Sequence, residues 1–364
     1  MKRRDFIAGA GAGALAAMPT LSAAQTAALP EIKWRMASSF PKSLDTIYGA
    51  AEFMTKRVAA ATGGKFQIQL FAAGEIVPGL KVQDAVQDGT VQCGQTAPYY
   101  YWGKDPAFAL DTGIPFGLNA RQMVAWQLFG GGAELFREFY KAYNIHSIPS
   151  GNTGAQMGGW YRKEIKSVAD LKGLKMRMGG FAGEVMRKLG VVPQQLAAPD
   201  VYPALEKGTL DAAEWVGPYD DEKLGFNKVA RFYYYPGWWE GGAQLCTYIN
   251  QKEWDKLPRE YQAIVEAAGW EANQWMLAKY DALNPPALRR LVTTGKAQLK
   301  AFPRDVMVAA YKASQEVYKE AAAKSPAFKR IHESMQKFQT DQLLWFRVAE
   351  KGFDDFMHTV GQIK

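Results

Sequence analysis

Two stretches that lie far apart in the chain share one pattern, AVQDGTVQCG (85–94) and ALEKGTLDAA (204–213). In each, a helical segment stops at a Gly-Thr pair, and a strand-like run follows. A glycine at this place is typical of a left-handed helix cap, so we expect that conformation at Gly89 and Gly208. The repetition predicts two similar α/β units in one chain.

The residues around both stretches extend this alternation of strands and helices. Before the first stretch, 31–39 and 65–71 have the alternation of strands, and 43–64 has one apolar helical face that ends at a glycine. Around the second, 167–180 predicts a turn of helix and a strand, and 181–190 a helix. Strand, helix, strand is the pattern of a parallel α/β layer. The sequence therefore predicts an α/β protein with two lobes and a cleft between them.

Two glycine-rich segments are predicted to connect the lobes, because both begin and end with strand-like residues. They are SIPSGNTGAQMGGWYRK (147–163) and YYYPGWWEGGAQLCTYIN (233–250). The predicted division of the chain is lobe one at 31–151 and 241–285, lobe two at 152–240 and 286–325, and a C-terminal helix at 326–364.

The C-terminal helix is predicted to run from Pro326 to about Gly361 with an apolar face along its length. At 1.5 Å per residue it would be about 50 Å long, which exceeds the width of one lobe. It must therefore wrap both lobes or reach a second subunit, and we expect a homodimer through this helix.

The first residues, MKRRDFIAGAGAGALAAMPTLSAAQ (1–25), have a basic start, a short apolar run and small residues near Ala24. This is the pattern of a secretory signal at 1–24, and the apolar run is too short to span a bilayer. Arg3 and Arg4 resemble a twin-arginine signal, which exports folded proteins. An ordinary Sec signal that contains two arginines is the alternative. Either predicts a periplasmic protein.

Composition narrows the class of ligand. The formal net charge of +8 falls to +6 without the signal, and the basic residues are dispersed rather than gathered in a dense block. This excludes a nucleic-acid tail and favours a small anionic ligand. Cys93 and Cys246 both lie in strand-like runs, where they form a disulfide or remain as free buried thiols.

The sequence gives little evidence of a catalytic site. The chain has no G-x-S-x-G, H-E-x-x-H or P-loop pattern. Asp211 and Glu214, with Asp220 and Asp221, offer the carboxylate pair of an exported hydrolase. Adjacent acidic residues are more often helix caps or solvated faces, so we regard this as the less favoured interpretation.

An anion site is better supported. Arg177 ends a predicted strand just before two glycines and a helix start. Parallel α/β sheets bind ligands at the carboxyl ends of their strands, and a guanidinium fork matches a carboxylate. Glu214 also ends a predicted strand, and a buried carboxylate needs a partner. That partner is either Arg177, in a plain salt bridge, or a cation.

Several of these segments resemble one family. The segments LKGLKMR (171–177), GTLDAAEW (208–215), YYYPGWWE (233–240) and PFGL (115–118) are similar to the DctP-type solute receptors of TRAP transporters. The resemblance covers essentially the whole mature chain, and it is greatest to the branch that binds 2-oxo acids.

The resemblance implies a type II periplasmic-binding-protein fold that closes on a ligand and passes it to integral membrane TRAP subunits. It implies that Arg177 holds the ligand carboxylate. It further implies a Na⁺ or Ca²⁺ ion between protein and ligand, at Gln156, Glu214, the carbonyl of Trp215, and Glu240. Gln156, Trp215 and Glu240 would therefore also be near the substrate.

Aromatic residues cluster at the predicted strand ends and connections, where most such residues pack the core. We expect Tyr100 and Tyr101 to line the pocket and to donate hydrogen bonds through their hydroxyls. The predicted ligand is a 2-oxo monocarboxylate such as pyruvate. Lactate or an aromatic carboxylate is the alternative within this class.

Overall fold

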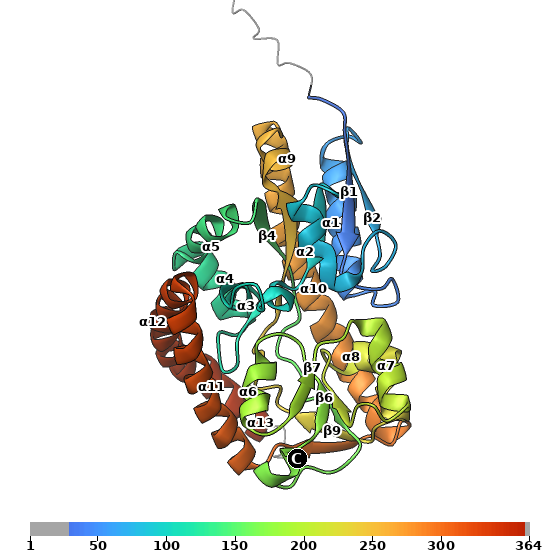
Figure 1. The fold of residues 1–364 in the computed structure, drawn as a ribbon, viewed down its shortest axis with the longest axis vertical. Coiled ribbons are helices and arrows are strands. Elements are labelled where there is room, and N and C mark those ends of the chain that lie inside the picture. The colour runs from blue at the N-terminus through green and yellow to red at the C-terminus, as the bar shows by residue number, and fades with distance from the viewer. Residues whose placement is uncertain (1–28, 361–364) are drawn as a thin grey trace, which may run out of the picture.

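The structure is a computed structural model that describes residues 29–360, so the predicted signal at 1–24 lies outside the described residues. Figure 1 shows two α/β lobes stacked along the long axis of the molecule, each built on its own sheet. Within the described part of the chain, we find no helix with the length and apolar character needed to cross a membrane.

Lobe one contains a five-stranded sheet in which β1 pairs in parallel with β2 and β3, while β10 is antiparallel to β3 and β4. The strand order is β2 (Phe66–Phe71), β1 (Ile32–Ser38), β3 (Cys93–Thr96), β10 (Gln244–Asn250) and β4 (Ile145–Asn152). The helix α1 (Ile47–Ala61) follows β1, and its apolar residues are buried as predicted.

Lobe two contains a six-stranded sheet in which β6 is parallel to β7 and β8, and β5 is antiparallel to β8 and β9. The order is β11 (Gln298–Ala301), β9 (Phe232–Tyr235), β5 (Trp160–Tyr161), β8 (Ala212–Ala213), β6 (Lys175–Arg177) and β7 (Val192–Gln194). The chain passes between the sheets at 153–159 and 236–243, inside the two segments predicted to connect the lobes. The residue boundaries of the lobes stay a prediction.

The shorter helices surround the sheets. They are α2 (Val82–Gln87), α3 (Ala107–Thr112), α4 (Ala120–Phe129), α5 (Gly132–Lys141), α6 (Ala182–Lys188), α7 (Ala198–Glu206), α8 (Pro218–Leu224) and α9 (Gln251–Asp255). Gly89 follows α2 with φ 77°, and Gly208 follows α7 with φ 73°. Both predicted left-handed caps are therefore confirmed.

One long helix, α10 (Arg259–Thr293), runs from lobe one into lobe two (Figure 1). It packs on α1 and β4 in lobe one and on α8 in lobe two. Pro285 and Pro286 lie inside it without ending it. The helix therefore joins the two lobes on one side of the molecule.

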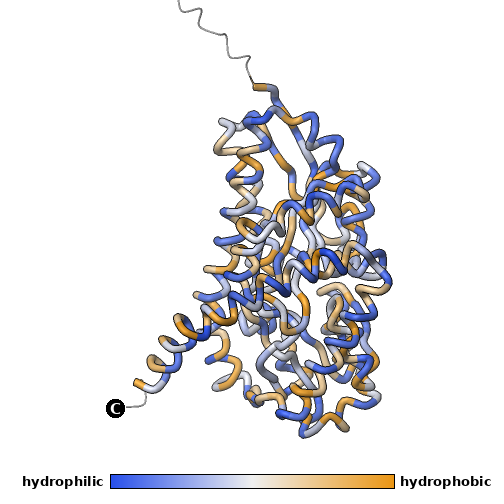
Figure 2. Tube along the Cα trace, turned by 90° about the vertical axis from the view of Figure 1, so that its left-hand side faces the viewer, coloured by the Kyte–Doolittle hydropathy of each residue, from blue (hydrophilic) through white to orange (hydrophobic). Residues whose placement is uncertain are grey.

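The C-terminal segment forms α11 (Arg304–Lys324), α12 (Pro326–Val348) and α13 (Glu350–Val360). Over the described residues, the helix predicted from Pro326 is interrupted at Ala349 alone, whose backbone stays helical (φ −83°, ψ −68°) and whose N–H donates to the Trp345 carbonyl at 2.9 Å. α11 packs on α6, and α12 packs on α3, α4 and α5, so this pair braces both lobes. Met335 is the last buried residue of α12, and beyond it Phe338 is still partly buried against the core. Arg121 of α4 lies over the Phe346 ring and pairs with Glu350 at 2.8 Å, although no residue of α13 is buried. Figure 2 shows the end of the chain extending away from the body.

The two cysteines are free and buried. They lie on the neighbouring strands β3 and β10, but Cys93 is opposite Ile249 and Cys246 is opposite Thr96. They are thus offset along the ladder. Cys246 Sγ donates to the Asp111 carboxylate at 3.3 Å, and Cys93 Sγ donates weakly to the Arg35 carbonyl at 3.6 Å.

Candidate functional site

The guanidinium of Arg177 is fixed at the carboxyl end of β6. Its side chain is 1% exposed, and Nη1 donates to the Glu214 carbonyl at 2.8 Å and also pairs with the Glu214 carboxylate. Nε donates to the Leu196 carbonyl at 3.3 Å. Nη2 has no hydrogen-bond partner within residues 29–360. Three of the five N–H groups are thus used, and two remain for another acceptor.

Glu214 follows β8, and the parallel pairing of β8 with β6 brings it beside Arg177. Its Oε1 accepts from Arg177 and from the backbone N–H of Gly179 at 2.6 Å. Its Oε2 is buried without a partner in the described part of the chain. Burial raises the pKa of this carboxyl, although Arg177 and Gly179 act in the opposite direction. The predicted salt bridge exists, and it uses only one carboxylate oxygen.

Gln156 and Glu240 come from the two connections between the lobes, and the N–H of Gln156 donates to the Glu240 carbonyl at 3.3 Å. Gln156 Nε2 donates to the hydroxyl of Thr153, while its Oε1 has no partner among the described residues. Glu240 Oε2 is also buried without one. Burial, and then the charge of Glu214, raise the pKa of Glu240 well above its usual range.

Four unpartnered polar atoms therefore occur in one group of interacting side chains. They are Arg177 Nη2, Gln156 Oε1, Glu214 Oε2 and Glu240 Oε2. A buried polar atom without a partner costs about 1–3 kcal/mol, so four in one place need an explanation. One donor and three acceptor oxygens fit an anionic ligand together with a cation.

The protein oxygens suit a hard cation. Within residues 29–360, no three His, Cys, Asp or Glu side chains form a cluster that could hold a metal ion. Glu214 and Glu240 would therefore be the only carboxylates at the site, joined by the amide oxygen of Gln156. Sodium and calcium prefer oxygen ligands of this kind.

Arg177 and Gln156 line a small cavity of about 10 Å³ between the lobes. The other lining residues are mostly apolar or aromatic: Phe40, Ile47, Ala97, Tyr99, Tyr100, Thr153, Trp215, Val216, Ala243 and Leu245. The indole ring of Trp215 lies 4.6 Å from the Arg177 guanidinium carbon. The free space is about that of one water molecule. A larger ligand therefore enters only if the lobes move apart.

Contacts across the cavity hold the lobes together. The side chain of Gln195, in lobe two, donates to the Tyr100 carbonyl of lobe one at 3.0 Å and accepts from the Gly180 N–H at 3.2 Å. The ring of Tyr99 lies against the two glycines that follow β6, where a Cβ on Gly179 would be 2.7 Å from the ring. These glycines allow the close approach of the two lobes.

The three consecutive tyrosines differ in role. Tyr100 lines the cavity as predicted, and burial raises its pKa to about 12, so its hydroxyl stays a neutral donor. Tyr101 is not among the lining residues, because its hydroxyl bonds to Thr96 at 2.8 Å and accepts from the Gln83 N–H at 3.1 Å inside lobe one. Tyr99 lines the cavity and was not predicted. Only the turn of the short helix Pro98–Tyr101 separates them.

The structure does not bring the acidic residues together as a catalytic pair. Asp211 accepts from the Lys175 N–H at 2.9 Å, at the start of β6, whereas Glu214 pairs with Arg177 at its end. Asp220 and Asp221 are buried, where Asp220 accepts from Tyr280 and Asp221 from other aromatic side chains. Asp211 therefore lies at the other end of the strand from Glu214.

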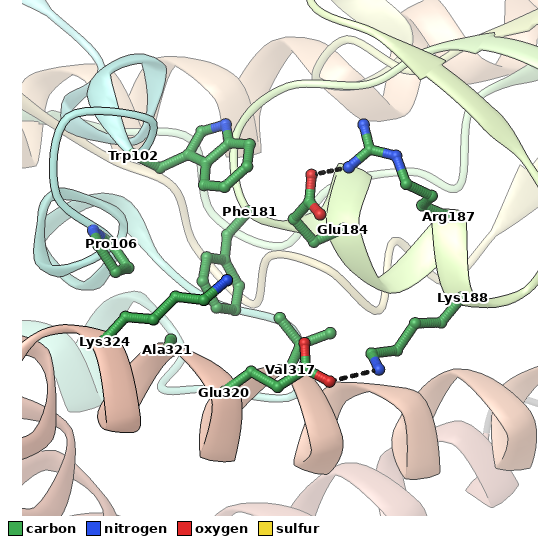
Figure 3. A pocket seen from close by; sticks show the side chains of 10 residues that line it. All are labelled: Trp102, Pro106, Phe181, Glu184, Arg187, Lys188, Val317, Glu320, Ala321 and Lys324. Atoms are coloured by element: carbon green, nitrogen blue, oxygen red, sulfur yellow. Dashed lines mark hydrogen bonds and ion pairs between the residues drawn. The ribbon is translucent and has the colours of Figure 1, made fainter.

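A larger groove of about 290 Å³ lies beside α6 and α11 (Figure 3). Its floor includes Trp102 and Phe181, and its charged side chains largely pair with one another, as Lys188 does with Glu320 at 2.7 Å. None of the four unpartnered atoms belongs to a residue that lines this groove, whereas Arg177 and Gln156 line the inner cavity. The cavity is therefore the better candidate despite its small volume.

Comparison with known proteins agrees with this geometry. The sequence model of the DctP family, described as bacterial extracellular solute-binding protein, family 7, matches residues 37–325. The chain is 51% identical over 362 residues to the monocarboxylate 2-oxoacid-binding periplasmic protein of Nostoc sp., with 98% of this chain and 99% of that protein covered.

Two solved structures share the fold. A TRAP transporter solute binding protein from Bordetella bronchiseptica has a TM-score of 0.90 at 55% identity, over 92% of this chain and 100% of that one. It is a mixed-occupancy dimer with copurified calcium and picolinate in one active site and an apo site. A TRAP periplasmic solute binding protein from Pseudoalteromonas atlantica, with bound sodium and pyruvate, has a TM-score of 0.86 at 38% identity, over 89% and 99%. These similarities confirm the predicted two-lobed binding-protein fold.

Proposed function

The chain belongs to family 7 of the bacterial extracellular solute-binding proteins, and from this premise we propose that it is the periplasmic receptor of a TRAP transporter. Its proposed ligand is a small 2-oxo monocarboxylate of the pyruvate type, bound together with Na⁺ or Ca²⁺. The receptor captures the ligand by lobe closure and delivers it to the membrane subunits. A secretory signal at 1–24, of the twin-arginine type, would export it.

The observation that carries this proposal is the group of four unpartnered atoms in the closed site. Arg177 Nη2 would hold the ligand carboxylate with its two free N–H groups. Gln156 Oε1, Glu214 Oε2 and Glu240 Oε2 would hold the cation, joined by the main-chain carbonyl of Trp215. When bound, the cation supplies positive charge between two buried carboxylates and an anionic ligand, which would otherwise repel one another.

A 2-oxo acid suits such a site because its keto oxygen lies on the carbon next to the carboxylate. One oxygen of each group can contact one cation while the other carboxylate oxygen faces Arg177. Picolinate offers a ring nitrogen in the corresponding place, and lactate a hydroxyl, so these are the alternatives. The apolar cavity wall, which includes Phe40, Ile47 and Leu245, suits the short hydrocarbon end of pyruvate.

The proposed work of the protein is selective binding and not reaction. The small residual space implies an open state for ligand entry and a closed state for retention, in the manner of hinge closure. The less favoured hydrolase would need Glu214 to act with Asp211, which caps the start of β6 instead. Stoichiometric recovery of unchanged ligand after long incubation supports the receptor, whereas turnover supports the hydrolase.

Metal removal tests the proposal directly. Protein stripped of metal and kept in potassium buffer should bind pyruvate weakly by calorimetry, and added Na⁺ or Ca²⁺ should restore binding. Thermodynamic linkage requires pyruvate to tighten cation binding by the same factor. Glu214→Gln keeps the shape but removes charge, so it should weaken the cation more than the matched control Asp211→Asn. Equally tight binding of pyruvate to metal-free protein would show that no bridging cation is needed.

We further propose that the receptor is a homodimer joined through the C-terminal helices. The end of α12 and all of α13 carry an exposed apolar face with no cover in the described chain. Its most exposed members are Leu344, Trp345, Val348, Phe353 and Phe356, which are 58–70% exposed. A contiguous apolar surface of this kind is typical of an interface.

Light scattering on the purified protein tests the dimer. The double variant Phe353→Glu with Phe356→Glu should be monomeric, and its melting temperature should change little at low concentration because α13 buries none of its residues in its own chain. Asp354→Ala, on the same helix, serves as the control. A monomeric wild-type protein would contradict the proposal and leave α12 as a brace between the lobes.

A further inference from the structure

Thr153 lies at the start of the first connection between the lobes, in the wall of the cavity. Its backbone N–H donates to the Ala243 carbonyl at 3.0 Å. Its hydroxyl makes three hydrogen bonds: to the Gly154 carbonyl at 2.8 Å, from the Ala243 N–H at 3.1 Å, and with Gln156 Nε2 at 3.2 Å. The residue is 2% exposed, so no bulk water competes for these bonds.

The chemistry of these partners fixes the direction of every bond. A hydroxyl has one proton to donate and two lone pairs that accept. The Gly154 carbonyl can only accept, so it takes the proton. The Ala243 N–H can only donate, so it occupies one lone pair. The remaining lone pair can only accept, and Gln156 must therefore present its amide nitrogen to Thr153.

This constraint determines what Gln156 presents on its other side. With the nitrogen held by Thr153, Oε1 is the atom left without a partner among the described residues. The reversed amide would place two N–H groups toward the cation and an oxygen against a lone pair of Thr153. The first contact would be repulsive, and the second would be relieved only if the hydroxyl turned its proton away from the Gly154 carbonyl, so the network favours the orientation with the nitrogen at Thr153.

We propose that Thr153 is a positioning residue that sets the amide of Gln156 with its oxygen toward the cation, an inference that rests on the proposed function. Thr153 itself need not touch the cation. It makes Gln156 a cation ligand rather than a hydrogen-bond donor to the substrate. The effect resembles that of outer residues that orient metal ligands in other sites.

The hydroxyl can be removed with little change of shape. Thr153→Val should lower calcium affinity, measured by calorimetry without pyruvate, by about 10- to 100-fold, the range for outer-shell partners of metal ligands. Thr153→Ser keeps the hydroxyl and should retain most of the affinity. Melting curves without metal check the fold, and Thr153→Ala replaces the valine variant if valine prevents folding.

A double-mutant cycle with Gln156→Glu separates orientation from general structural support. Glutamate has two equivalent oxygens, so no reversed state exists for Thr153 to prevent. The loss caused by Thr153→Val should therefore be much smaller in the Gln156→Glu background. A loss of equal size in both backgrounds would show that Thr153 only ties the connections together, and would overturn the proposal.

The cycle also distinguishes this inference from the proposed function. If the wild-type protein binds neither Na⁺ nor Ca²⁺, the cation site itself is refuted. If the wild type binds calcium and Thr153→Val binds it equally well, only the role of Thr153 is refuted. Both the cation site and the role of Thr153 are supported if Thr153→Val binds calcium weakly, Thr153→Ser binds it strongly, and the loss is smaller in the Gln156→Glu background.

Discussion

Replacing Arg177 by lysine tests the placement of the ligand. The guanidinium uses Nε for the Leu196 carbonyl and Nη1 for Glu214, and its Nη2 is left for the ligand carboxylate. A lysine has a single nitrogen, which cannot serve all three directions. If this nitrogen stays with Glu214, the ligand loses hydrogen bonds to a charged donor, worth about 1.5–3 kcal/mol. At about 1.4 kcal/mol per tenfold, pyruvate affinity should fall roughly 10- to 150-fold.

Isothermal calorimetry with pyruvate at a fixed calcium concentration measures this loss, and the affinity for calcium alone should change much less. Arg187→Lys is the matched control, because this arginine is more than half exposed and pairs with Glu184 on the surface of α6. Arg177→Met would instead leave the Glu214 charge buried without a counterion and destabilise the fold by about 3–5 kcal/mol. Unchanged pyruvate binding by the folded lysine variant would refute the placement of the ligand at Arg177.

Two further predictions concern stability and lobe closure. Burial raises the pKa of Asp220 to about 6, against the opposing hydrogen bond from Tyr280, so the folded state binds this proton more tightly than the unfolded state. The stability that this bound proton contributes is fully present below about pH 4 and is lost as the pH rises through about 6. Urea unfolding should therefore show that Asp220→Asn gains stability relative to the wild type between these two pH values. A difference in stability that stays constant with pH would contradict this. Gly179→Ala should weaken pyruvate binding, because its Cβ would be 2.7 Å from the Tyr99 ring when the lobes close. Gly183→Ala, whose Cβ would have ordinary contacts from 3.5 Å outward, should bind normally, and equal affinities of the two variants would argue against this contact.

Residue types and their spacing were enough to predict the local structure and a site at the strand ends. Gly89 and Gly208 could be identified as caps because a left-handed turn after a helix depends on the residue type at that place. Arg177 and Glu214 could be placed at strand ends because the surrounding pattern gives the length of each strand. The two connections between the lobes could also be predicted, because each is a glycine-rich segment that begins and ends with strand-like residues.

Other features depended on which segments pack together, and no local pattern carries that information. Tyr99, Tyr100 and Tyr101 are equivalent as sequence, and only the docking of their short helix sends one hydroxyl into lobe one and two rings into the cavity. The interruption of the helix at Ala349 and the lack of buried residues in α13 are likewise not marked by the continuous apolar pattern.

Both the sequence and the tertiary structure were needed to identify the partner of Glu214. Its residue type and position predicted either Arg177 or a cation, and the sequence left that choice open. The tertiary structure assigns Oε1 to Arg177 and Gly179, and it leaves Oε2 buried and unpartnered with atoms of Gln156 and Glu240. The orientation of the Gln156 amide was likewise decided only in three dimensions. It depends on a saturated hydroxyl whose partners come from both connections between the lobes, and this arrangement exists only after those connections have met.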